Sequence, residues 1–159
     1  MPEELTIDKC VLLHCDSRGD DAETYCESSK AFIHYWKIKT TLFACLNGGI
    51  DKEYTQLSQA GQTWLVGVMI ENRYARKKRC IKGAQRVDFR EKKNVPLHDA
   101  DFDYVDAASQ STSLLWLSNE TNWQKDRYRR RIHGAFGVEI QNVNEYMNGV
   151  GAQGGAEAS

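Results

Sequence analysis

The stretch that decides the fold is residues 5–49, which read LTIDKCVLLHCDSRGDDAETYCESSKAFIHYWKIKTTLFACLNGG. Apolar side chains alternate with polar ones over residues 5–15, and this period of two predicts a strand. The polar run DSRGDD at 16–21 predicts a turn, because Asp, Ser and Gly are residues that turns favour. The chain is therefore expected to begin with a strand followed by a tight connection.

Residues 22–46 carry a long helical period. Apolar side chains, including Phe32 and Trp36, recur at intervals of three and four, which places them on one face of a helix. We expect a helix over this range, either continuous or broken near Thr40, where β-branched residues cluster. The N-G-G sequence at 47–49 predicts its end, because Gly adopts the left-handed conformation that closes helices.

A second helical period begins at Asp51, a residue suited to an N-cap, and passes into the basic run at 73–93. Gly61 weakens its middle, so two shorter helices are possible. A helix over RKKR at 76–79 would be charged on every side, because successive residues turn by about 100°. Such a segment cannot pack deeply, so we expect it to project from the body or to unwind. Val87 and Phe89 alternate with polar residues and predict a short strand.

The C-terminal part predicts two further helices and a strand. We expect one helix from Asp99, because acids in its first turns suit the helix dipole, and another from Asn119, as N-cap, to Gly134. Residues 136–140 alternate in polarity and predict a final strand. Residues 149–159 are rich in Gly and Ala, have little to bury, and predict a mobile tail.

Together these elements predict a helix-rich α+β fold with a few short strands, and an all-α bundle is the alternative. The 159 residues, of which 41% are apolar, suit one ordinary domain, which we assign to residues 1–148 with the tail at 149–159. The apolar stretch 64–70 is far shorter than the roughly 20 residues of a membrane span. The N-terminus carries no apolar signal segment. Five cysteines in such a chain predict reduced thiols in an intracellular protein of the cytoplasm or nucleus.

Charge is distributed in blocks. Residues 73–93 hold ten basic residues and two acids, and residues 123–133 hold five basic residues and one acid, although the net charge of the chain is −1. A protein that coats nucleic acid is normally basic overall, so that class is excluded and any nucleic-acid contact should be local. The acidic remainder could also pair with the basic blocks of a partner or of a second copy.

Both basic blocks are candidate sites for nucleic acid or another polyanion. Lys and Arg neutralise phosphates, and in the second block a Trp shares a helical face with arginines, an arrangement that can clamp phosphates and stack a base. The alternative is a solvated surface with the Trp packed under the arginine stems. The candidate binding residues are Arg73, Arg76, Lys77, Lys78, Arg79, Lys82, Arg86, Trp123, Arg127, Arg130 and Arg131.

The sequence contains no nucleophile elbow, phosphate-binding loop, dinucleotide fingerprint or metalloprotease helix. We therefore favour a small non-enzymatic protein that binds nucleic acid or another polyanion through the two basic blocks, without a cofactor, a metal or a membrane partner. The alternative is a protein–protein interaction module, such as an inhibitor, an adaptor or a self-assembling subunit, and a small enzyme is the third hypothesis. That module would use the alternating charge and aromatic anchors.

Two weaker patterns involve metal-binding or nucleophilic residue types. The acids Asp99, Asp101, Asp103 and Asp106 have the spacing that opens a calcium loop, but the Gly and Glu that the loop requires later are missing. Two or three of these acids could hold Mg²⁺, although an acidic helix start is the favoured interpretation.

The cysteines and histidines form no recurrent motif. Cys10, His14, Cys15 and Cys26 match no zinc module. A nucleophilic pair would combine Cys15 or Cys45 with His14, His34 or His98. A small buried apolar role is the commoner one for Cys, and is favoured here.

Overall fold

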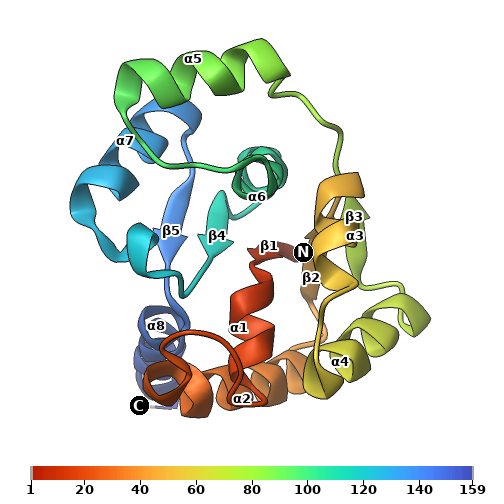
Figure 1. The fold of residues 1–159 in the computed structure, drawn as a ribbon. Coiled ribbons are helices and arrows are strands. Elements are labelled where there is room, and N and C mark those ends of the chain that lie inside the picture. Colours follow the sequence, from red (N-terminus) through yellow and green to blue (C-terminus); the bar gives the residue numbers. More distant parts are fainter. Residues whose placement is uncertain (1, 159) are drawn as a thin grey trace.

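The computed structural model describes residues 2–158, with side chains described through residue 151. Helices and strands alternate along the chain (Figure 1). The strands are β1 (Glu3–Ile7), β2 (Leu42–Leu46), β3 (Tyr74–Arg76), β4 (Leu115–Leu117) and β5 (Glu139–Gln141). The helices are α1 (Lys9–His14), α2 (Ala22–Ile38), α3 (Gly48–Tyr54), α4 (Gln59–Ile70), α5 (Gly83–Lys93), α6 (Asp99–Ser109), the 3-10 helix η1 (Thr121–Gln124), α7 (Asp126–Phe136) and α8 (Val143–Ala158).

The strands form one parallel sheet in the order β3-β2-β1-β4-β5. Glu3 of β1 lies opposite Leu42 of β2, and Thr6 of β1 lies opposite Trp116 of β4. The chain moves outward from β1 through β2 and β3, and then returns to the other side of β1 at β4. In open α/β sheets a ligand crevice forms at the carboxyl ends of the strands where the order reverses. Here that position lies between β1 and β4.

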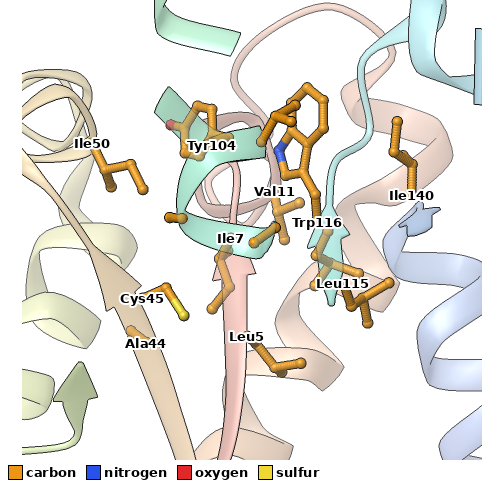
Figure 2. Packing of buried hydrophobic residues seen from close by; sticks show 14 of the residues in the cluster. Leu5, Ile7, Val11, Ala44, Cys45, Ile50, Tyr104, Leu115, Trp116 and Ile140 are labelled. Atoms are coloured by element: carbon orange, nitrogen blue, oxygen red, sulfur yellow. The ribbon is translucent and has the colours of Figure 1, made fainter. Parts of the chain in front are cut away.

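The core lies on both sides of this sheet. Leu5, Thr6 and Ile7 of β1 are fully buried, as expected for a central parallel strand covered on both faces. Figure 1 shows α5, α6 and α7 on one side of the strands and α2, α4 and α8 on the other. Figure 2 shows Tyr104 of α6 beside Trp116 of β4, and their rings stack at 5.8 Å.

Aromatic rings pack α2 against α4 and against α8. The ring of Trp36 meets that of Trp64 edge-on at 5.4 Å. The ring of Phe32 meets that of Tyr146 of α8 at 5.7 Å. Such edge-to-face pairs add about 0.5–1.5 kcal/mol each beyond the burial of their area. None of the helices in the described chain is long and apolar enough to cross a membrane.

The predicted helix-rich α+β domain is confirmed, but the helix expected over 22–46 is wrong in its second half. Helix α2 ends at Ile38, and residues 42–46 form β2. Residues 42–46 form a strand because the sheet buries this apolar run on both faces. This tertiary burial outweighs the helical period of the local sequence. The N-G-G sequence starts the next helix instead of ending one, since Asn47 Oδ1 accepts a 2.9 Å hydrogen bond from Ile50 N.

The basic segment at 76–79 does not form a projecting helix. The other outcome that we predicted, an unwound segment, is confirmed, since residues 77–79 are neither helix nor strand. Residues 74–76 pair with β2 as the edge strand β3, and residues 77–82 lead from it to α5. The strand predicted at Val87 and Phe89 is also wrong, because both residues lie in α5. Phe89 packs edge-on against Phe102 of α6 at 6.0 Å, so its apolar face belongs to a helix interface.

The helix predicted from Asp99 is confirmed as α6. Asn119 does not cap a helix beginning beside it; its Oδ1 accepts a 2.9 Å hydrogen bond from Val143 N, at the start of α8. The final strand is shorter than expected, because α7 continues to Phe136. Helix α8 runs into the predicted tail, but the side chains of residues 152–158 lie outside the described part, so its mobility stays a prediction.

Candidate metal centre and basic cleft

The carboxyl ends of β1 and β4 carry two acids of the candidate centre. Asp8 follows β1 directly and is the N-cap of α1, where its Oδ1 accepts a 3.3 Å hydrogen bond from Cys10 N. Glu120 follows β4 by three residues. The third acid, Asp101, is in the first turn of α6, whose N-terminus reaches the same edge of the sheet. Sheet topology thus unites three separate segments.

We call Asp8, Asp101 and Glu120 the carboxylate triad. Each acid presents one carboxylate oxygen, and these three oxygens all lie within 4.8 Å of one another. Asp8 is 1% exposed and Asp101 is 7% exposed, whereas Glu120 is partly exposed. Clustered carboxylate oxygens are the ligands preferred by hard divalent cations such as Mg²⁺ and Mn²⁺. The triad therefore has the chemistry and the spacing of a cation site that is open on the side of Glu120.

Each acid of the triad is oriented by neighbouring donors, and Asp8 has Ser118 Oγ in addition to Cys10 N. The hydrogen bonds run from Ser118 Oγ to Asp8 at 2.9 Å, from His98 N to Asp101 at 2.9 Å, and from Trp123 Nε1 to Glu120 at 3.0 Å. Asp101 Oδ1 and Glu120 Oε1 accept no hydrogen bond from the described residues. Likewise, within residues 2–151 no Lys, Arg or His side chain forms an ion pair with the triad. Buried charges are normally paired or bound to a metal, so the ionised form of the triad would require a cation from outside these residues.

Proximity and burial make the triad hard to ionise. Burial raises the pKa of Asp8, and the charges of Glu120 and Asp101 raise it further. Burial raises the pKa of Asp101 to about 7, with the charge of Glu120 as the second cause. Burial also raises the pKa of Glu120, against the hydrogen bond from Trp123. A bound divalent cation would favour the ionised forms of all three acids.

Glu53 of α3 connects the triad to a neighbouring cleft. Its charge contributes to the raised pKa values of Asp101 and Glu120. Lys9 Nζ lies 3.5 Å from Glu53 Oε1, and the charge of Lys9 acts in the opposite direction on the pKa of Glu120. Glu53 thus lies within electrostatic reach of the triad while lining the cleft itself.

The cleft has a volume of about 660 Å³ and lies among α3, α5 and α6. This volume falls within the roughly 300–1,000 Å³ of typical ligand sites. The residues lining it are Gly49, Lys52, Glu53, Arg79, Ile81, Lys82, Gly83, Arg86, Asp99, Ala100 and Asp103. Four cationic and three acidic side chains therefore line the cleft, and two of the cations come from the segment between β3 and α5. The triad residues do not line it themselves, but Glu53 and Ala100, which precedes Asp101 in the chain, do.

Two acids of α6 hold the cationic residues of the cleft and the segment before α5 in place. Asp103 Oδ1 accepts a 3.0 Å hydrogen bond from Arg86 Nη2, and its Oδ2 accepts one of 3.3 Å from Arg79 Nη2. Asp106 Oδ2 accepts hydrogen bonds of 2.8 and 3.0 Å from the backbone N–H groups of residues 80–81. Asp103 and Asp106 are 5% and 0% exposed. They consequently hold the basic segment in place and are not available to a metal.

Gly49 allows α3 to approach Asp103. A Cβ atom at this position would lie 1.8 Å from Asp103 Oδ2, well inside any allowed contact. The absence of a side chain is therefore a requirement of the packing between α3 and α6, and it sets the position of the cleft wall.

The structure divides the first predicted binding block. Arg73 is 5% exposed and donates to the backbone oxygens of Leu42, Trp36 and Lys39. This side chain anchors α2 to the sheet edge and cannot present itself to a polyanion. The remaining residues of the block are placed as follows: Arg76 pairs with Asp51, Lys77 pairs with Glu4, Lys78 is exposed, and Arg79, Lys82 and Arg86 line the cleft.

The second block is also divided. Trp123 is fully buried in η1, so the predicted stacking surface is wrong, and its indole instead holds Glu120 of the triad. Arg127, Arg130 and Arg131 are exposed on α7. The three arginines remain candidates for polyanion binding, whereas Trp123 orients Glu120 of the carboxylate triad through its indole N–H.

The acidic pattern at 99–106 does not act as one group. Asp101 alone joins the triad, whereas the exposed Asp99 pairs with Arg90 at 2.6 Å. Among the described residues the triad is the one group of three potential metal ligands at this spacing, so Cys10, His14, Cys15 and Cys26 form no zinc site.

A cysteine nucleophile is not supported. Burial raises the pKa of Cys15 to about 12 and that of Cys45 to about 11, which keeps both thiols neutral and poorly reactive. The buried apolar role that the sequence favoured for these cysteines is confirmed for Cys15 and Cys45, and their pairing with a histidine has no electrostatic basis.

Sequence reasoning missed Asp8 and Glu120. The available signal was a polar residue directly after each apolar strand, in LTI-D and LLWL-SNE. That signal becomes informative only when both strands are recognised as parallel neighbours, since their carboxyl ends then meet at one edge. Comparison with protein-family models and with curated proteins finds no match to this chain.

Proposed function

We propose that this protein is a divalent-metal-dependent hydrolase that cleaves phosphodiester bonds of nucleic acid. The observation that carries the proposal is the carboxylate triad, whose oxygens lie within 4.8 Å of one another without a cationic partner in the described chain. It lies at the reversal of strand order and adjoins a cleft bordered by four cationic side chains. A non-enzymatic polyanion-binding protein would use the cleft but has no need for the triad.

The triad suits Mg²⁺ or Mn²⁺ because its donors are all oxygen atoms and two of the acids are almost fully buried. A bound ion of this kind polarises a phosphoryl oxygen and makes water a stronger acid. Ser118, His98 N and Trp123 keep the three carboxylates oriented before any ion arrives. Such preorganisation supports the affinity of metal sites.

The cleft favours a phosphate-containing polymer as the substrate. Lys52 and Lys82 are exposed at its border and form no ion pair within residues 2–151. The charged head of Arg79 is half exposed although it contacts Asp103. Cations of this kind neutralise backbone phosphates without reading sequence. The net charge of −1 confines this attraction to the cleft and the surfaces next to it.

The test is hydrolysis of end-labelled single-stranded RNA and DNA by the purified protein with Mg²⁺, with Mn²⁺, or with a chelator. We expect cleavage that requires the divalent ion. Nucleic acid that binds but stays intact under every metal condition would leave a binding protein and contradict the hydrolase. Absence of both binding and cleavage would refute the nucleic-acid substrate.

In the same assay, the double variant Lys52→Gln/Lys82→Gln is expected to raise KM about 10-fold with little change in kcat. The reason is that phosphate contacts away from the reacting bond contribute equally to ground-state and transition-state binding. The matched control is Lys30→Gln/Lys37→Gln, which removes two exposed lysines of α2 and should leave KM unchanged. A fall in kcat alone would instead assign the cleft lysines to the chemical step.

Stability should depend on pH and metal in a way that reports on the triad. The folded protein holds a proton on Asp101 up to about pH 7, whereas the unfolded chain releases it near the ordinary pKa of 3.8. Raising the pH from about 4 to about 7 therefore lowers the free energy of unfolding of the metal-free protein. Added Mg²⁺ should stabilise the fold more at pH 8 than at pH 5, because metal binding requires ionised carboxylates. Thermal midpoints measured with Mg²⁺ and with a chelator would check this, and equal shifts at both pH values would contradict it.

Protein association is a second candidate function, favoured by one surface. Helix α4 exposes Val66, Met69 and Ile70, with exposed fractions of 57%, 36% and 76%. Exposed apolar groups that cluster in this way are typical of interaction surfaces. A second copy or another protein could bind there independently of the cleft.

The proposed setting is intracellular. The five cysteines are free thiols, the state that reducing compartments maintain. Nucleic acid and millimolar Mg²⁺ would both be accessible there, in keeping with the proposed activity.

A further inference from the structure

A small cavity between the end of α5 and the start of α7 presents hydrogen-bond donors. It is lined by Asn94, Arg127, Tyr128 and Arg131 and has a volume of about 170 Å³. Guanidinium, amide and phenol groups are all able to donate hydrogen bonds, and no carboxylate lines the cavity. Its volume is below the roughly 300–1,000 Å³ of sites for whole small molecules, so it is suited to a single anionic group.

The arginines of this cavity differ from most others in the chain. Arg86, Arg90 and Arg129 each pair with a carboxylate, whereas Arg127 and Arg131 form no ion pair with any described residue. Arg131 Nη1 donates to Lys93 O at 3.1 Å, which directs its guanidinium toward the end of α5. Their charges therefore remain available to an anion from outside.

Two cations lie at the start of α7, where they lower the stability of the helix. Lys125 is the N-cap and Arg127 lies in the first turn, where the positive end of the helix dipole disfavours cations by about 0.3–1 kcal/mol each. Asp126 is the only acid in that first turn. Both cations contact the Tyr128 ring, but neither pairs with a carboxylate of a described residue, and such a departure from a local rule is typical of a functional surface. The cations and the dipole together create a strongly positive spot.

The geometry points to a phosphate site: we infer that this cavity binds a backbone phosphate of the same polynucleotide strand that occupies the cleft. The inference rests on the proposed function, because it requires a nucleic-acid ligand. It assigns the cavity to a subsite separate from both the triad and the cationic residues of the cleft. Paired guanidinium groups are the preferred protein ligands for phosphate.

The chain places this subsite close to the triad. Asn94 and His98 are four residues apart, and four residues span at most about 14 Å. His98 supplies the backbone N–H that holds Asp101. From the other side, the ring of Tyr128 lies 6.2 Å from the ring of Trp123, whose indole holds Glu120. A strand crossing the triad could therefore reach the cavity with a neighbouring phosphate.

Phosphate fits this surface better than a base does. The guanidinium of Arg127 lies 4.8 Å from the centre of the Tyr128 ring, and Lys125 Nζ lies 5.6 Å from it. The ring therefore already has cationic partners and is not a free stacking platform. Arg127 Nη2 lies 3.3 Å from Tyr128 Oη, which leaves the phenol O–H able to donate to an anion.

The test measures binding of labelled oligothymidylate and oligouridylate of about 20 nucleotides, longer than the roughly 4–16 that one single-strand-binding fold covers. Measurements in a chelator, from about 50 to 200 mM salt, prevent cleavage and define the salt dependence. For Arg127→Gln/Arg131→Gln we expect at least about a 10-fold loss of affinity. The slope of log K against log salt should fall by about 0.7, the value for one neutralised phosphate on a single strand.

The matched control is Arg18→Gln/Lys37→Gln, which removes two exposed cations outside the cavity and should leave the slope unchanged. Equal losses in both double variants would overturn the subsite in favour of general surface attraction. Unchanged binding by the Arg127→Gln/Arg131→Gln variant would also overturn the subsite. If the Lys52→Gln/Lys82→Gln variant nevertheless lost binding, the proposed function would stand without the subsite. No binding by the unmodified protein would refute both. Equal dependence for DNA and RNA is expected, because the phosphate is common to them.

Discussion

Replacing Asp101 by Asn is expected to abolish metal-dependent hydrolysis while making the metal-free protein more stable. Asn has the same shape, and its side-chain oxygen can still accept the hydrogen bond from His98 N. It removes one of three carboxylates whose oxygens lie within 4.8 Å of one another. The loss of activity should exceed the roughly 10–100-fold that follows from altering groups that only support a metal ligand.

The stability change gives this variant a second, independent readout. Burial and the charge of Glu120 raise the pKa of Asp101 from 3.8 to about 7, and each unit corresponds to about 1.4 kcal/mol. Removing the charge should therefore raise the free energy of unfolding at pH 8 by up to about 4 kcal/mol in a chelator. The stabilisation produced by added Mg²⁺ should largely disappear.

The matched control for this change is Asp88→Asn. Asp88 is an exposed acid of α5 that pairs with Lys92 at 3.0 Å, so its replacement should affect neither activity nor the response to Mg²⁺. Urea unfolding with and without Mg²⁺, together with the hydrolysis assay, checks both variants. An Asp101→Asn protein that keeps full activity would refute the triad as the metal centre.

The second large effect is expected from Gly49→Ala, which should lower the free energy of unfolding by about 3 kcal/mol. The new Cβ would meet Asp103 Oδ2 at 1.8 Å, and relieving that contact disturbs the buried pair of Asp103 with Arg86. Overpacking costs about 1–3 kcal/mol, and breaking a buried ion pair costs about 3–5 kcal/mol. Urea denaturation followed by circular dichroism measures the change.

The neighbouring glycine is an internal control. No atom lies within 4 Å of a Cβ built on Gly48, so Gly48→Ala should be neutral or stabilising by up to about 1 kcal/mol. In an Asp103→Ala background the cost of Gly49→Ala should shrink, because the two nearest clashing atoms, Oδ2 and Cγ, are gone and only Cβ remains, at 2.7 Å. An unchanged cost in that background would mean that the penalty does not come from the Asp103 carboxylate.

Local pattern predicted part of the fold correctly. The acids that begin at Asp99 and the apolar face of residues 22–38 correctly predicted helices α6 and α2. The strand β2 was missed because its apolar residues continue a helical period and their burial on two faces appears only once the sheet is assembled. The charge of residues 76–79 predicted a segment that projects or unwinds. The segment is unwound, but it does not project, because edge pairing with β2 and hydrogen bonds to α6 hold it.

The candidate site was less accessible from sequence than the fold. Short-range motifs cannot join Asp8, Asp101 and Glu120, because these acids are brought together by strands that pair across more than a hundred residues. The conspicuous acids around Asp101 face another way: Asp103 binds arginines, and Asp99 lies at the surface. Similarly, Trp123 appeared to belong to an exposed arginine face because its burial in η1 could not be read from the helical period.

Composition and local pattern establish that the chain is helix-rich, carries two cationic segments, and contains no signature of a known catalytic motif. These properties depend on residues close together along the chain. Which cations line a cleft, which are buried, and which three acids lie together follows from the folded arrangement alone. The physical reason is that the electrostatics of a site depend on distance and burial, and the parallel sheet brings distant strand ends together at one edge.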